Sequence, residues 1–158
     1  MSVKTPDRLL LAAFACLALA ALLAAARPSH ALLGLFSGPT SLTPANGAVS
    51  FPLADLADGK AHFYAVTAGG KEVRFFAVKT GDGKVRTAFD ACDVCYPEKK
   101  GYRQEGEFML CINCGRRFHV TMVGEQRGGC NPSPLASEVA GESVRVTLAD
   151  IAAGAAFF

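Results

Sequence analysis

Five cysteines lie between Cys92 and Cys130 of this chain, and four of them form two Cys-x-x-Cys pairs. The pairs are Cys92 with Cys95 and Cys111 with Cys114, and the segment 96–110 separates them. A Cys-x-x-Cys turn directs two sulfurs toward one point, so two such turns at the ends of a hairpin can form a cage of four sulfurs. Zinc, a single iron and a two-iron cluster all accept four thiolates. The spacing therefore predicts a metal or iron–sulfur site, or else paired thiols.

Residues 1–31 have the composition of a targeting segment. Lys4 and Arg8 form a short basic start, and an unbroken apolar run extends from Leu9 to Ala26. This order is typical of a secretory signal peptide, and the run also reaches the shortest length that spans a bilayer. We expect residues 1–31 to be a signal peptide or an N-terminal membrane anchor. The remaining chain would then be periplasmic, or anchored to the inner membrane with its domain on the periplasmic side.

Export makes disulfide chemistry the main alternative for the cysteines, because exported proteins can form disulfides. Five is an odd number, however, so complete pairing would leave one thiol over. The chain also lacks the βαβ pattern of a thioredoxin-like protein. Inert buried thiols are the third interpretation, and we favour the metal site over both. The sixth cysteine, Cys16, lies in the apolar run and is interpreted as a small apolar residue.

Residues 32–48 are rich in glycine and proline and predict a linker, and residues 49–158 predict a single β-domain. The whole chain holds 16 basic and 14 acidic residues. Three basic residues and one acidic residue lie before residue 32, so 13 of each remain and the exported part is neutral. Nothing in this balance indicates a nucleic-acid partner. About 110 residues are enough for one domain with its own core.

Short apolar and aromatic runs separated by glycine turns follow from residue 49 onward. Gly69-Gly70 is typical of a two-residue hairpin turn. We expect strands over residues 61–67, 71–79, 85–89, 101–104, 107–110, 118–123 and 144–148, and one helical turn over 148–153. The fold class is therefore all-β: a small antiparallel sandwich or barrel, with the cysteine loops of residues 90–135 forming a metal-binding tip.

Three sequence stretches resemble the FtrD-like membrane iron–sulfur family. They are FDACDVC at 89–95, CINCGRRF at 111–118 and GGCNPSPL at 128–135, within a similarity that extends from about residue 61 to residue 151. The resemblance implies an iron–sulfur cluster or iron as the cofactor, with zinc as the alternative. It also implies a role beside bacterial iron transport, with a membrane-bound iron permease or a redox protein as the partner.

A more distant resemblance concerns the arrangement of the loops. Rieske domains carry two ligand loops at the tip of a small antiparallel domain, and the second reads Cys-x-x-His-Gly before a strand with Phe. Here Cys111-x-x-Cys114-Gly115 is similar, with cysteine in the histidine position. A zinc-ribbon-like subdomain would show the same two pairs. Replacing two imidazoles with thiolates adds negative charge, which should lower the potential of a two-iron cluster below the Rieske range.

Cys130 follows Gly128-Gly129 and would lie in a third loop near the four sulfurs. We expect it near the site as a replacement ligand, a supporting thiol or a resolving thiol, and a buried small residue is the alternative. His119 is interpreted as an exposed strand histidine in preference to a ligand, and His62 as a core or edge histidine.

These features predict an exported or membrane-anchored protein that binds metal or an iron–sulfur cluster and transfers electrons beside iron transport. The chain shows no hydrolytic triad, phosphate loop or carboxylate pair, so we do not expect an independent enzyme. The alternatives are a structural zinc module for partner binding and a periplasmic thiol–disulfide protein. Visible colour distinguishes iron from zinc, because zinc with four thiolates is colourless.

Overall fold

The computed structural model describes residues 38–158. The predicted signal peptide or anchor at residues 1–31 lies outside the described residues, and so does the first part of the predicted linker. Within the part of the chain that is described, no helix is both long and apolar enough to cross a membrane.

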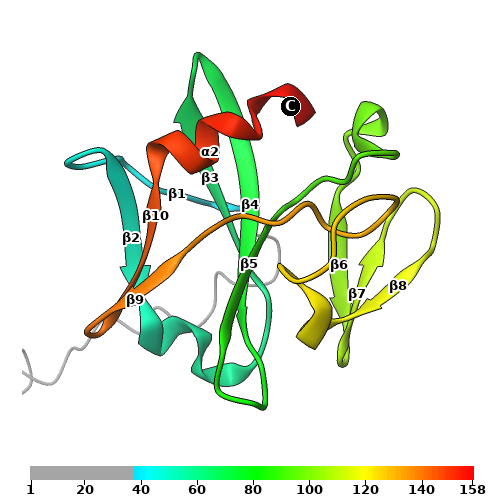
Figure 1. Cartoon of the computed structure of the whole chain (residues 1–158), viewed down its shortest axis with the longest axis horizontal. Coiled ribbons are helices and arrows are strands. Elements are labelled where there is room, and N and C mark those ends of the chain that lie inside the picture. The colour runs from blue at the N-terminus through cyan, green and yellow to red at the C-terminus, as the bar shows by residue number, and fades with distance from the viewer. Residues whose placement is uncertain (1–37) are drawn as a thin grey trace, which may run out of the picture. The chain divides into compact units, whose positions relative to one another are not determined.

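The described chain is mostly β-structure arranged as three small sheets. In Figure 1 the sheet β1-β3-β4-β5 lies between the sheet β2-β10-β9 on one side and the sheet β6-β7-β8 on the other. The strands are β1 (Thr40–Ser41), β2 (Ala48–Pro52), β3 (His62–Ala68), β4 (Lys71–Lys79), β5 (Val85–Phe89), β6 (Tyr102–Glu105), β7 (Phe108–Cys111), β8 (Arg117–His119), β9 (Glu138–Ala140) and β10 (Ser143–Thr147). The helical turns are η2 (Leu53–Asp58), η3 (Tyr96–Glu98), η4 (Val120–Met122), α2 (Leu148–Ala153) and η5 (Ala155–Phe157).

This arrangement confirms the all-β class and the antiparallel pairing, although the described strands do not close into a barrel. The predicted hairpin at Gly69-Gly70 is present, with φ values of 59° and 77° that favour glycine. Its strands pair antiparallel from His62 opposite Ala77 to Ala68 opposite Lys71. Strand β5 then adds to the other edge of β4.

Two local differences from the sequence prediction have physical reasons. The single strand expected over residues 118–123 ends at His119, whose ring nitrogen accepts a hydrogen bond from the backbone N–H of Thr121 and caps η4. Thr40–Ser41, within the predicted linker, forms a parallel strand beside Tyr64 and Ala65. Its short polar sequence shows no strand periodicity. The strand forms because the exposed edge of β3 supplies the pairing.

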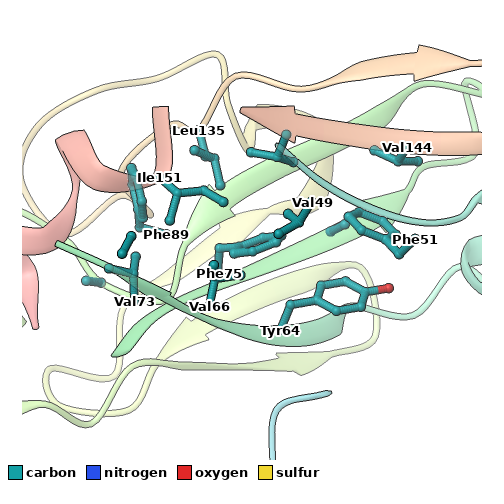
Figure 2. Close-up of a cluster of buried hydrophobic side chains, with 14 of the residues drawn as sticks. Val49, Phe51, Tyr64, Val66, Val73, Phe75, Phe89, Leu135, Val144 and Ile151 are labelled. Atoms are coloured by element: carbon teal, nitrogen blue, oxygen red, sulfur yellow. The ribbon is translucent and has the colours of Figure 1, made fainter. Parts of the chain in front are cut away.

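A large apolar core lies between the central sheet and the β2-β10-β9 sheet. Figure 2 shows its aromatic centre, where Phe51 stacks on Tyr64 and both lie against Phe75. Helix α2 closes one end of this core with Ile151, which is completely buried. The other buried members include Val49, Leu56, Val66, Val73, Phe89, Leu135, Val144 and Val146.

The opposite face of the central sheet carries a second, smaller core against the β6-β7-β8 sheet. Phe76 on β4 and Met109 on β7 are fully buried there. Three of the buried members are cysteines: Cys92, Cys111 and Cys130. The alternation of β4 thus sends Phe75 into the apolar core and Phe76 toward the thiols.

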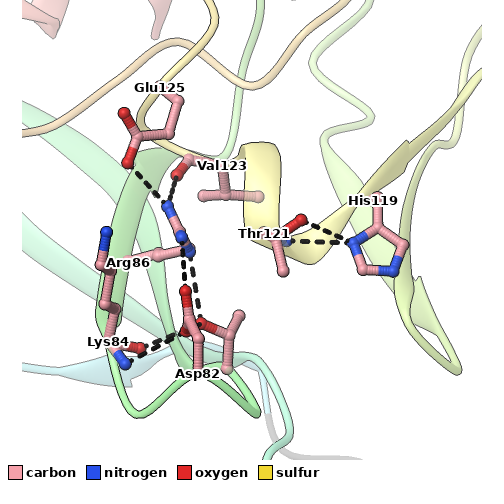
Figure 3. Close-up of polar contacts among 8 residues, drawn as sticks. Asp82, Lys84, Arg86, His119, Thr121, Val123 and Glu125 are labelled. Atoms are coloured by element: carbon pink, nitrogen blue, oxygen red, sulfur yellow. Dashed lines mark hydrogen bonds and ion pairs between the residues drawn. The ribbon is translucent and has the colours of Figure 1, made fainter.

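An ion-pair network ties β5 to the chain that follows β8. Figure 3 shows the Arg86 guanidinium between the carboxylates of Asp82, at 3.0 Å, and Glu125, at 2.9 Å. Arg86 is itself buried. The Thr80 hydroxyl, the Lys84 backbone N–H and Arg86 all donate to Asp82 and lower its pKa to about 2. The network holds the base of the third cysteine loop against the central sheet.

Candidate metal centre

The first cysteine loop begins directly where β5 ends. Cys92 is buried against the smaller core, and the backbone N–H of Cys95 donates to its sulfur at 3.1 Å. The backbone N–H of Tyr96 closes the turn by donating to the Cys92 carbonyl at 3.3 Å. An N–H group directed at a sulfur stabilises its thiolate, which is the form that binds metal.

The second loop joins β7 to β8 and has the same construction. The backbone N–H of Gly115 donates to the carbonyl of Cys111 at 2.9 Å, and Gly115 takes a φ of 72°. Burial raises the pKa of the Cys111 thiol to about 11, although the backbone N–H groups of Cys114 and Asn113 act against that rise. The backbone N–H of Arg116 lowers the pKa of the exposed Cys114 thiol to about 7.

The third loop carries Cys130, which the structure brings to the two Cys-x-x-Cys turns. The Cys130 sulfur lies 3.8 Å from the Cys95 sulfur. Gly128 and Gly129 precede it with φ values of 87° and 63°, so the backbone reverses immediately before the cysteine. Burial, followed by the neighbouring sulfurs of Cys114 and Cys95, raises the pKa of the Cys130 thiol to about 12.

The five sulfurs form two sets of three that share one member. One set is Cys92, Cys95 and Cys111, and the other is Cys95, Cys114 and Cys130; within each set all sulfurs lie within 4.8 Å of one another. Cys95 is therefore close to all four of the other cysteines. The metal-ligating groups found among the described residues contain only cysteine, so their donors are soft sulfurs suited to iron–sulfur clusters, iron or zinc.

The sulfurs differ in their access to solvent. Cys92, Cys111 and Cys130 are 1%, 2% and 8% exposed, Cys95 is half-buried and Cys114 is exposed. The centre thus has a closed side formed by the smaller core and an open side formed by the second loop. The exposed sulfur of Cys114 can be reached by a docked partner, while the apolar side keeps water from most of the other sulfurs.

Asp90 links the first loop to the β6–β7 hairpin. Its carboxylate accepts a hydrogen bond from the backbone N–H of Tyr102 at 2.7 Å. Burial raises the pKa of Asp90 to about 6, against the lowering effects of that N–H and of the Arg74 charge. Gly101 takes a φ of 67° directly beside the carboxylate, where a Cβ would collide with it, and its carbonyl accepts from the N–H of Ile112 at 3.0 Å. Asp90 and Gly101 therefore fix the positions of the first and second cysteine loops relative to each other.

Tyr102 lies beneath the cluster and joins the hairpin to the third loop. It is the strand partner of Cys111, and its hydroxyl donates to the carbonyl of Cys130 at 2.7 Å. Its ring packs between Phe76 and Phe118, and burial raises its pKa. Sequence reasoning missed both Tyr102 and Asp90. The position of Asp90 just before Cys92 was a visible signal, but its hydrogen-bond partner lies on the following hairpin and no local pattern indicates it.

The other candidate residues lie outside the sulfur sets. His119 contacts the Thr121 hydroxyl at 2.8 Å, and His62 contacts Asp58 at 3.0 Å. These contacts explain both histidines without a metal.

Comparison with known proteins finds one family. Residues 56–158 match the model described as "Membrane iron-sulfur containing protein FtrD-like". The match covers all three cysteine loops and all of the chain from the end of η2 onward. No curated protein and no solved structure matches the chain.

Proposed function

Because the chain belongs to the FtrD-like family of membrane iron–sulfur proteins, we propose that its cysteine cluster holds an iron–sulfur centre that transfers single electrons beside an iron-transport system. Cys92, Cys95, Cys111 and Cys114 are the proposed ligands. The family description associates the chain with membranes and iron–sulfur chemistry, and the electron-transfer role is our extension of it.

The convergence of the sulfurs is the observation that supports this proposal. Cys95 lies within 4.8 Å of four other sulfurs, and the five sulfurs come from three separate loops. Bringing thiols together has an electrostatic cost once they ionise, and a bound cation removes that cost. The residues present therefore fit a thiolate-ligated iron centre. When bound, such a centre supplies one-electron exchange at a potential set by its charge and surroundings.

The chain's own residues would tune and protect the centre. The N–H groups of Cys95, Asn113 and Arg116 point at sulfurs and stabilise the thiolates. Phe76 and Met109 close the inner side against water. Four thiolates without imidazole should place the potential below the Rieske range, toward that of plant-type ferredoxins.

The open side suggests where a partner would dock. Val94 and Ile112 lie within the two Cys-x-x-Cys turns and are 59% and 41% exposed, and Cys114 is exposed beside Ile112 in the sequence. We propose that a membrane-bound iron permease or a redox protein contacts this side. In this proposal the domain lies on the periplasmic side of the inner membrane, either free or anchored through the N-terminal segment.

A structural zinc site is the second candidate, because an all-sulfur donor set holds zinc equally well. The decisive experiment is anaerobic purification of the full chain, followed by iron, zinc and sulfide analysis and a visible spectrum. We expect iron, acid-labile sulfide and visible absorption. Stoichiometric zinc in a colourless protein would overturn the electron-transfer proposal.

Variants then locate the centre. Cys111→Ser should lose most of the bound iron, because it removes a buried ligand. Val139→Ser is the control, because it places a serine on the exposed strand β9, outside the three cysteine loops. Equal iron content in both variants would place the centre elsewhere.

A further inference from the structure

The cluster contains five thiols, one more than a four-thiolate centre needs. Three of them, Cys92, Cys95 and Cys111, form one close set, while Cys114 and Cys130 both adjoin Cys95. We propose that Cys114 and Cys130 are interchangeable ligands: Cys114 serves from the solvent side, and Cys130 takes its place from the protein side when Cys114 is absent. This inference rests on the proposed function, since it concerns the same centre.

The positions of the sulfurs support this exchange. Cys114 and Cys130 lie within 4.8 Å of each other and of Cys95, so either sulfur can extend the set to which Cys95 belongs. The separation of Cys95 and Cys130, at 3.8 Å between sulfurs, is close to the spacing of two thiolates on one tetrahedral metal with metal–sulfur bonds of about 2.3 Å. A short shift of the metal toward Cys130 would therefore replace one ligand with the other.

The surroundings of the two cysteines differ in the way that exchange requires. Cys114 is exposed and follows a loop whose residues Ile112 and Asn113 are also exposed. Cys130 is only 8% exposed and belongs to the smaller core. The outer ligand is thus open to reagents and to oxidation, whereas the inner one is shielded. A centre with a shielded substitute can keep its metal when the exposed thiol is lost.

The third loop is built to hold Cys130 in place. The buried Tyr102 hydroxyl donates to the Cys130 carbonyl at 2.7 Å. The N–H of Asn131 closes a turn onto Gly128 at 3.3 Å, and the N–H of Ser133 donates to the carbonyl of Ala91, beside Cys92, at 2.9 Å. These hydrogen bonds orient Cys130 toward the other sulfurs. A cysteine that served only as a small core residue would not need to face the thiols of Cys95 and Cys114.

The test uses cobalt(II), whose visible bands report the number of sulfur ligands. The metal-free full chain and its variants are titrated with cobalt(II) alone, without oxygen and with all thiols reduced. We expect Cys114→Ser and Cys130→Ser each to retain a four-sulfur spectrum and to lose less than about tenfold in affinity. The double variant should show three sulfurs and lose more than about 100-fold in affinity.

The single variant Cys114→Ser decides the question even if the double variant does not fold. A spectrum of three sulfurs and one oxygen in that variant would show that Cys130 does not replace Cys114, and would overturn the inference. A Cys130→Ser variant that is as defective as the double would also overturn it, because Cys130 would then be a fixed ligand. Val139→Ser, on the exposed strand β9, is the control for serine substitution.

Failure of this inference is distinguishable from failure of the proposed function. If Cys92→Ser abolishes cobalt binding while Cys114→Ser shows only three sulfurs, the metal centre stands and the exchange does not. If Cys92→Ser binds cobalt like the unmodified chain, the centre itself is wrong.

Discussion

The two cores on the opposite faces of the central sheet differ in the side chains that they contain. The larger one contains Phe51, Tyr64 and Phe75 packed against aliphatic side chains, with no cysteine among its buried members. The smaller one contains Cys92, Cys111 and Cys130 among its buried members. Apolar packing stabilises the first directly, because burying carbon removes it from water. The second core buries thiols, and the stability of that burial depends on whether the thiols bind a metal.

This difference suggests that the two halves of the β-domain are stabilised in different ways, one by apolar packing and the other by metal binding. Strands β3, β4 and β5 contribute side chains to both cores, so we expect them to form a scaffold that does not require metal. The β6-β7-β8 strands are short, and Cys92, Cys111 and Cys130 are among the buried members of the core beneath them, so metal binding should contribute much of the stability of this half. The predictions below test this division from the largest expected effect to the smallest.

Truncation of the larger core should destabilise the whole domain. Phe75 is completely buried, so we expect Phe75→Ala to lower the free energy of unfolding by about 3–5 kcal/mol. The metal bound per folded molecule should not change, because Phe75 faces away from the thiols. Chemical denaturation with metal analysis of the folded fraction provides the measurement.

Phe108→Ala is the matched control for that truncation, since Phe108 on β7 is 38% exposed. Its loss should be at most about 1 kcal/mol. An equal loss in the two variants would remove the distinction between core and surface on which the comparison depends.

Metal removal should destabilise the half of the domain that contains the thiols. We expect a chelator to lower the protection of amides in residues 90–131 while residues 62–89 remain protected, because only the former are held by the cluster. Hydrogen exchange of the metal-loaded and metal-free chain measures both regions in one experiment. Uniform loss of protection would mean that the two cores fold as one unit and would contradict the division.

Gly101 offers a more local test of the thiol half. Gly101→Ala should cost about 3 kcal/mol or more and reduce metal content, because its Cβ would collide with the Asp90 carboxylate at a φ of 67°. Gly106→Ala is matched, since Gly106 has a φ of 59° but open space around it, and should cost only about 1–2 kcal/mol. Equal costs, measured by thermal denaturation and metal analysis, would show that backbone strain alone matters.

The smallest effect concerns acid stability in the scaffold half. The pKa of Asp82 is lowered from 3.8 to about 2, so its contribution to stability is present above about pH 4 and is lost as the pH falls toward 2. The difference in stability between the unmodified chain and Asp82→Asn should therefore shrink over this window. Denaturation of the metal-free proteins at pH 5 and pH 3 measures it, with Glu142→Gln, an exposed carboxylate on another turn, as the control. A constant difference would contradict the assigned pKa.

Much of the fold is readable from the sequence because it is encoded locally. The Gly69-Gly70 turn and the alternation over residues 71–79 predict the central hairpin with its bounds nearly as observed. The helical turn over residues 148–153 coincides with α2. Strands β1, β2 and β9 were missed, because each is short and is stabilised by pairing with a strand that a distant or later part of the chain supplies.

The sequence by itself also determined the chemistry of the candidate site. Each Cys-x-x-Cys turn directs its two thiols toward one point because the turn is a local structure, so the two pairs predict a thiolate site before the fold is known. The family resemblance was carried by the same stretches and is confirmed over residues 56–158. The identity of the ligands, the redox role and the Rieske-like comparison stay predictions.

Only the tertiary structure decided how the five thiols share the site. It places Cys95 in both sets, buries Cys130 and leaves Cys114 exposed. These positions depend on contacts between residues far apart in the sequence, such as that of the Tyr102 hydroxyl with Cys130 and that of the Asp90 carboxylate with the hairpin. No local pattern encodes such contacts, because they arise only when the loops pack against one face of the central sheet.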